Sequence, residues 1–176
     1  MPHAVYDLNR VDKITAGAVG EPGHRVFYIQ ARKGRRLVTL VVEKEQLAAL
    51  NQAIDHLLLQ LAGDDPRDVA GPDMPSEGGM GLEMPLEPAF RAGQLSLGYD
   101  QVSSKVVIVA EELAEEGQDA KPSIARFWAH PAQMRAFSLN AQQAIAAGRP
   151  LCAMCGQAID PAGHFCPRRN GDRKAP

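Results

Sequence analysis

The clearest pattern along the chain is a pair of short apolar runs followed by a segment of helical period. Residues 25–32 and 37–42 are rich in β-branched and aromatic side chains, which is typical of β-strands. Because only a short turn separates them, they are predicted to pair as an antiparallel hairpin. From about Lys44 to Leu61, apolar residues recur at steps of three and four, which predicts an amphipathic helix that ends at Gly63.

The same order of elements returns in the second half of the chain. At a shift of 76 positions residues 90–95 echo residues 14–19, and at a shift of 87 positions the second predicted helix aligns with the first. The other elements predicted in this half are strands at 105–110 and 124–129 and a helix from near Pro131 to Gly148. Each half therefore reads as three strands and a helix, which indicates an internal duplication; chance similarity between short apolar segments is the alternative.

These elements predict an α+β fold in which two β-β-β-α repeats form an antiparallel sheet covered by two helices. The repeats are expected at residues 1–62 and 89–149. Between them, residues 63–88 contain five proline and five glycine residues with mostly acidic charges. An exposed linker that either crosses the molecule or is partly disordered is predicted there. Residues 150–176 follow as a small C-terminal unit with a basic tail.

The composition is that of an ordinary globular protein, with 45% hydrophobic residues among 176. No run approaches the roughly 20 apolar residues that span a bilayer, and the N-terminus lacks the basic and apolar regions of a secretory signal. We therefore expect a cytoplasmic protein with no membrane partner. The chain has three cysteines, and because all lie within fifteen residues they form a poor disulfide framework.

The net charge of −2 hides a strong asymmetry along the chain. Residues 1–120 contain 11 Lys/Arg and 19 Asp/Glu, whereas residues 121–176 contain 8 Lys/Arg and 2 Asp/Glu. This separation favours an anionic partner for the C-terminal part, and attraction between the two parts of one fold is the alternative. The candidate contacts to an anion or nucleic acid are Arg32, Lys33, Arg35 and Arg36 at the predicted hairpin tip, and Arg168, Arg169, Arg173 and Lys174 in the tail.

The C-terminal unit contains four side chains that can bind a metal. Cys152, Cys155, His164 and Cys166 follow the pattern C-x2-C-G, then H-x-C, with turn-forming residues between the two pairs. Cys3His is a standard ligand set for zinc, and four protein ligands leave no position for a reacting water. The pattern therefore predicts a structural zinc knuckle. The alternatives are a redox C-x2-C pair, three unrelated cysteines, or iron in place of zinc.

Several segments spread over nearly the whole chain resemble one known family, the bacterial DUF3090 family. These segments are Thr15–Gly17, Gly20–Gly23, Phe27–Arg32, Phe90–Leu95, Leu97–Asp100, Arg126–Trp128, and Cys152–Arg168 with Asn170-Gly171. The family is functionally uncharacterised. The resemblance implies a repeat-containing bacterial protein with the Cys/His ending as a family feature. It also implies a gene encoded near those of histidine-phosphatase-like proteins, which suggests such a protein as a partner. The chain departs from the usual pattern at His130, where a Ser, Thr or Asp helix cap is more common.

Two classes of function fit these observations. The first is a non-enzymatic adaptor that binds another protein, with the asymmetric charge orienting the partner. The alternative is a protein that binds RNA or DNA through the basic tail and the basic hairpin tip. An enzyme is not expected, because the sequence offers no paired acid and base, no nucleophile setting and no open metal position.

Overall fold

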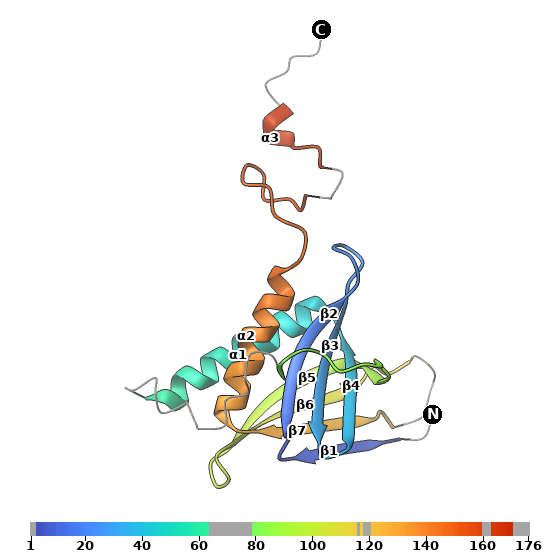
Figure 1. Cartoon of the computed structure of the whole chain (residues 1–176), viewed down its shortest axis with the longest axis vertical. Helices are drawn as coiled ribbons and strands as arrows, with labels where there is room; N and C mark the ends of the chain where they lie inside the picture. Colours follow the sequence, from blue (N-terminus) through green and yellow to red (C-terminus); the bar gives the residue numbers. More distant parts are fainter. Residues whose placement is uncertain (1–2, 64–78, 116, 118–120, 160–162, 171–176) are drawn as a thin grey trace.

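The computed structural model describes residues 3–63, 79–115, 117, 121–159 and 163–170. Within these residues the body is one seven-stranded sheet, in the order β1-β7-β6-β5-β4-β3-β2, with two long helices packed against it (Figure 1). The strands are β1 (Val5–Asn9), β2 (Lys13–Val19), β3 (Val26–Lys33), β4 (Arg36–Val42), β5 (Pro88–Asp100), β6 (Lys105–Glu112) and β7 (Ile124–Ala129). The helices are α1 (Lys44–Ala62), α2 (Pro131–Ala146) and the short α3 (Pro167–Asn170). The predicted α+β fold class is confirmed.

The sheet is mixed, which corrects the expectation of a wholly antiparallel sheet. Four strand pairs are antiparallel, but β4 pairs with β5 and β1 pairs with β7 in parallel. A parallel neighbour requires a long crossover connection. The chain between β4 and β5 supplies one, because α1 lies within it. The strand β1 was not predicted from the sequence, and it adds a fourth strand before α1.

The two edges of the sheet meet where β1 passes into β2. These strands are consecutive in the chain but lie at opposite ends of the strand order. The backbone N–H of Val11 donates to the carbonyl of Trp128 in β7 (2.8 Å), and that of Asp12 donates to the carbonyl of Arg32 in β3 (2.7 Å). The junction therefore connects β7 to β3, and the sheet curls around its own apolar side chains.

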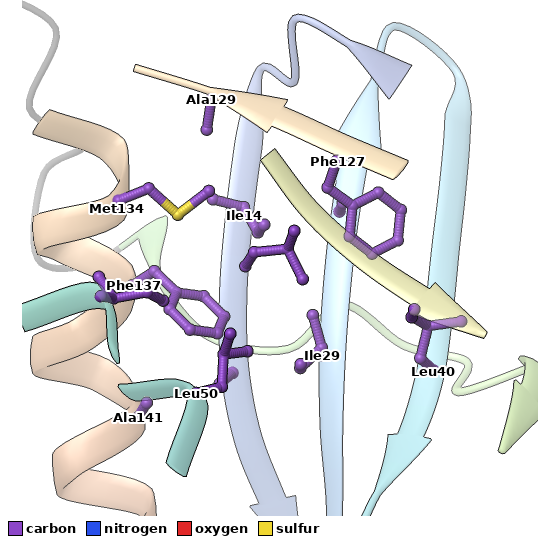
Figure 2. Close-up of a cluster of buried hydrophobic side chains, with 14 of the residues drawn as sticks. Ile14, Ile29, Leu40, Leu50, Phe127, Ala129, Met134, Phe137 and Ala141 are labelled. Carbon is purple, nitrogen blue, oxygen red and sulfur yellow. The ribbon is translucent and has the colours of Figure 1, made fainter. Parts of the chain in front are cut away.

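A single hydrophobic core fills the space between the curled sheet and the helices. Figure 2 shows Ile29, Leu40 and Phe127 of the sheet facing Met134 and Phe137 of α2, and all five are fully buried. The apolar stripe predicted for the first helix is its buried face, at Leu47, Leu50, Ile54 and Leu58. The helical period therefore identified the correct face.

Part of the predicted linker lies against the sheet. Thr15 donates to the carbonyl of Met80 at 2.5 Å, and Met80 itself is buried. Gln30 donates to the carbonyl of Glu83 (3.0 Å) and accepts from its N–H (2.7 Å). Residues 79–87 therefore cover buried polar groups of β2 and β3 rather than standing free in solvent. Residues 64–78 of the predicted linker lie outside the described residues.

Each half follows the predicted order of three strands and a helix, β2-β3-β4-α1 and β5-β6-β7-α2. Within the described part of the chain, neither long helix combines the length and apolar composition needed to cross a membrane.

Candidate metal centre

Beyond α2 the chain forms a small module, described at residues 150–159 and 163–170, that extends away from the body (Figure 1). Its first part is a tight hairpin in which Leu151 and Ala158 form an antiparallel bridge. The N–H of Cys152 donates to the carbonyl of Gln157 (2.8 Å), and the N–H of Ile159 donates to that of Pro150 (2.7 Å). These bonds hold a short loop at the tip of the hairpin.

The loop brings the first two cysteines together. The N–H of Gly156 donates to the carbonyl of Cys152 (2.8 Å), which closes a turn around Cys155. Gly156 has a φ of 74°, a value that residues with a side chain rarely adopt, so glycine is required at this position. The local sequence thus explains why both thiols point to one side.

The four predicted ligands converge on one point. The ligand atoms of Cys152, Cys155, His164 and Cys166 all lie within 4.8 Å of one another. The Sγ atoms of Cys152 and Cys166 are 3.9 Å apart, and the Sγ of Cys155 is 3.3 Å from the Nε2 of His164. Zinc–sulfur bonds of about 2.3 Å in a tetrahedron put two sulfur ligands roughly 3.8 Å apart. The donor set and its spacing therefore fit a tetrahedral metal ion.

The electrostatics of the cluster also favour a cation. The backbone N–H groups of Cys155 and Met154 point at the Cys152 sulfur and lower the pKa of its thiol to about 6. The N–H of Gln157 acts in the same direction on Cys155, but burial and the neighbouring thiols of Cys152 and Cys166 outweigh it and raise the pKa of Cys155. A cation bound between the sulfurs would offset the repulsion that raises the pKa of Cys155.

The geometry argues against a disulfide in the cluster and against the redox alternative for these cysteines. The described cysteines are free, and a separation of 3.9 Å between Cys152 and Cys166 is far beyond a disulfide bond of about 2.05 Å. A redox C-x2-C pair usually opens a helix, whereas Cys152 and Cys155 lie in a hairpin loop.

The helix α3 closes the module. Arg168 Nη1 donates to the carbonyl of Met154 (3.1 Å), which connects α3 to the loop between the first two ligands. Cys166, directly before α3, is only 5% exposed, and the other three ligands are half-buried. One ligand is therefore withdrawn from solvent and the other three are partly withdrawn.

Most of the cations predicted at the hairpin tip already contact other groups of the chain. Arg32 donates to the Glu83 carboxylate from Nε, which lies 2.9 Å from both oxygens, and from Nη2, and this contact raises the pKa of Arg32. Lys33 donates to the carbonyl of Asn9. Arg36 lies over the ring of Tyr6, with 5.4 Å between the guanidinium carbon and the ring centroid.

Of the remaining predicted cations, Arg35 is exposed in the β3–β4 turn and Arg169 lies in α3. Arg173 and Lys174 lie outside the described residues. The β3–β4 turn and the module lie at opposite ends of the body, because the turn adjoins β1 while the module extends from the other end (Figure 1). The two basic segments therefore do not form one continuous surface.

Sequence reasoning missed the exposed apolar side chains beside the ligands. Met154, between the first two cysteines, is 50% exposed, and Phe165, between His164 and Cys166, is 74% exposed. The sequence contained a signal for both side chains. Each is a large apolar residue next to a predicted metal ligand, in a segment that has few other large apolar residues. The cluster holds both side chains at the surface of the module.

With this geometry established, comparison with family models matches residues 6–166 to DUF3090, a protein family of unknown function. The chain belongs to the DUF3090 family. The matched region ends at Cys166, so all four candidate ligands lie inside the DUF3090 region and the basic residues of the tail lie outside it. No curated protein and no solved structure matches the chain.

Proposed function

We propose that the Cys/His cluster is a structural zinc site and that the protein acts as a non-enzymatic adaptor in the cytoplasm. Zinc is the metal that best suits three thiolates and one imidazole in a tetrahedron. Four protein ligands complete its coordination, so the ion would hold the module together and would not activate a water molecule. Iron also accepts thiolate ligands, and metal analysis distinguishes the two.

The observation that carries the adaptor proposal is the exposure of Met154 and Phe165 on the module. Each side chain is within one residue of a ligand, so metal binding would fix its position in advance. Aromatic residues and methionine are enriched in the buried centres of protein interfaces. Pre-positioned side chains also lose less conformational entropy on binding. A projecting module with these two side chains at its surface suits the role of a protein contact.

The experiment compares capture of a partner by the full-length protein and by two variants. A histidine-phosphatase-like protein is the first partner to test in purified form, because the family resemblance implies it. Phe165→Ser removes the most exposed apolar side chain of the module, whereas Val102→Ser removes one that is 96% exposed in the β5–β6 turn of the body. We expect Phe165→Ser to weaken binding by about tenfold or more and Val102→Ser to leave it unchanged.

If the two substitutions change the affinity for the partner equally, and both variants retain zinc, the partner does not bind through the module. If the tested partner does not bind wild-type protein, cross-linking in the native cell identifies a protein that does. Binding of that captured protein to Phe165→Ser and to Val102→Ser is then compared in the same way.

Nucleic-acid binding is the second candidate, and it is favoured by the exposed Phe165, which precedes Arg168 by three residues in the chain. An exposed aromatic ring can stack on an unpaired base while an arginine contacts phosphate. Titration with short labelled RNA and DNA at low and near-physiological salt tests this candidate. Binding that weakens steeply with salt and is lost in both Phe165→Ser and Arg168→Gln supports it, and absence of binding at low salt excludes it.

A further inference from the structure

A cleft of about 270 Å³ lies between the body and the C-terminal module. It is bounded by the β2–β3 turn, the first residue of α1 and the chain that leads from α2 into the module. Three cationic side chains line it, Arg25, Lys44 and Arg149, and the other lining residues carry no charge. The three cations come from three separate parts of the chain, and the sequence analysis did not predict that they would meet.

Two of these cations are directed at one small space above Gly148. A Cβ atom placed on Gly148 would lie 3.0 Å from Nη2 of Arg25 and 3.7 Å from Nζ of Lys44. Both charged groups therefore border the room that the missing side chain of Gly148 leaves. Like charges held this close repel each other, and an anion placed between them would remove the repulsion.

The guanidinium of Arg25 is fixed in position before any ligand binds. Its Nη1 donates to the carbonyl of Ala144 near the end of α2 (2.7 Å), and its central carbon lies 5.0 Å from the ring centroid of Phe27. These contacts leave Nη2 on the side that faces Gly148. A positioned guanidinium loses little freedom when it binds an anion, and its N–H groups match the oxygens of phosphate.

The third cation borders the same cleft from the turn side. Nε of Arg149 lies 3.4 Å from the place that a Cβ atom would occupy on Gly23. Gly23 has a φ of 94°, so the conformation of this turn favours glycine there. Room is thus left by Gly148 beside Arg25 and Lys44, while Arg149, which also interacts with another group of the chain, borders the cleft from the turn side.

We propose that this cleft binds a phosphate group, either as free phosphate or as the phosphomonoester of a small molecule. A dianion with several oxygens can contact cations that approach from different directions, which a single carboxylate does less well. The volume is at the small end of ligand pockets, so the phosphate group and a small attached group would fill it. The proposal stands independently of the adaptor role and of the metal site, since no metal ligand lines the cleft.

Isothermal titration of the full-length protein with inorganic phosphate and with adenosine monophosphate tests the proposal. We expect saturable binding with a Kd of about 1 mM or tighter for at least one of the two probes. Tighter binding of the monophosphate assigns the site to a phosphomonoester, and equal binding assigns it to free phosphate. Absence of saturable binding by either probe overturns the proposal.

Lys44→Gln is the informative variant, because Lys44 is exposed and its substitution leaves the contacts of Arg25 intact. We expect it to weaken phosphate binding by about tenfold or more. Lys121→Gln removes the same charge from an exposed position that does not line the cleft, and should leave the affinity unchanged. Equal weakening by both variants would show a general charge effect and would overturn the proposed site. The melting temperature of each variant without ligand confirms that it is folded.

Discussion

Gln46 and Gln133 make the same set of contacts in the two halves of the molecule. Each is the third residue of its helix, and its Oε1 accepts the backbone N–H of the residue before the helix, at 2.9 Å in both cases. Each then donates from Nε2 to two successive backbone carbonyls of a strand region. For Gln46 these are Ala92 and Gly93, and for Gln133 they are Val11 and Asp12.

The shared glutamine contacts indicate which strands correspond if the chain arose by duplication: β1 and β2 together, and β5. The carbonyls bound by Gln133 lie at the junction of β1 and β2, and those bound by Gln46 lie at an irregularity within the long strand β5. The β1–β2 junction and the irregular part of β5 therefore make the same kind of contact, each with the glutamine of one long helix. The equivalence supports the proposed duplication. It aligns Val11 with Ala92, a shift of 81, instead of the shift of 76 that sequence comparison indicated.

Replacing either glutamine by alanine should destabilise the fold. Gln133→Ala removes the helix cap and leaves buried carbonyls without a donor, so we expect a loss of about 1–3 kcal/mol in the free energy of unfolding. Gln46 is less buried, and Gln46→Ala should cost about 1 kcal/mol. Urea unfolding measures both. Gln143→Ala and Gln52→Ala, at exposed positions of the same helices, serve as controls, and costs as large in the controls would show that the capping contacts are unimportant.

Gly93→Ala should also destabilise the protein, because an added Cβ atom would lie 2.8 Å from the backbone Cα of Leu113. Backbone atoms cannot move aside easily, so we expect a cost of about 1–3 kcal/mol. Gly17→Ala meets only the Leu82 side chain at the same distance and should cost less, since that side chain can turn away. Gly81→Ala meets nothing within 4 Å and should not destabilise. Thermal unfolding that ranks the three in another order would contradict this description of the sheet.

Glu83 should make stability depend on pH. Its hydrogen bond with Arg32 holds the pKa of the Glu83 carboxyl below its ordinary value of 4.5 in the folded protein. Its contribution to stability is therefore present above pH 4.5 and is lost as the pH falls through the lowered pKa. Glu83→Gln should lower the free energy of unfolding at neutral pH and have a smaller effect in acid. Glu87→Gln, an exposed carboxylate in the same segment, is the control; a pH profile for Glu83→Gln that parallels wild type would contradict the role of this ion pair.

The sequence carried enough information for the helices and the ligand cluster. The faces of both helices follow from a local period, and the four ligands lie within fifteen residues with glycines at the turns, so neither depends on distant parts of the chain. The strand β1 was missed because its five residues mix polar and apolar side chains, and its place beside β7 depends on a contact across the whole chain.

Contacts between distant parts of the chain determine which cations are paired and which meet in a cleft, and the sequence alone could not predict them. Arg32 belongs to a basic run in the sequence, yet Glu83 binds it from 51 residues away. Arg25 and Lys44 are isolated cations in the sequence, and only the fold brings them together over Gly148. Reasoning from local charge density therefore selected Arg32, which already pairs with Glu83 in the fold. It missed the cleft in which Arg25 and Lys44 meet.

Metal analysis of the purified full-length protein, together with its Cys155→Ser and Met154→Ala variants, tests the central claim most directly. We predict one equivalent of zinc per chain in wild type, loss of zinc in Cys155→Ser with protease cleavage confined to residues 150–170, and full zinc content in Met154→Ala. Unchanged zinc in Cys155→Ser, or a wild-type protein that neither contains nor takes up zinc, would contradict the structural zinc site.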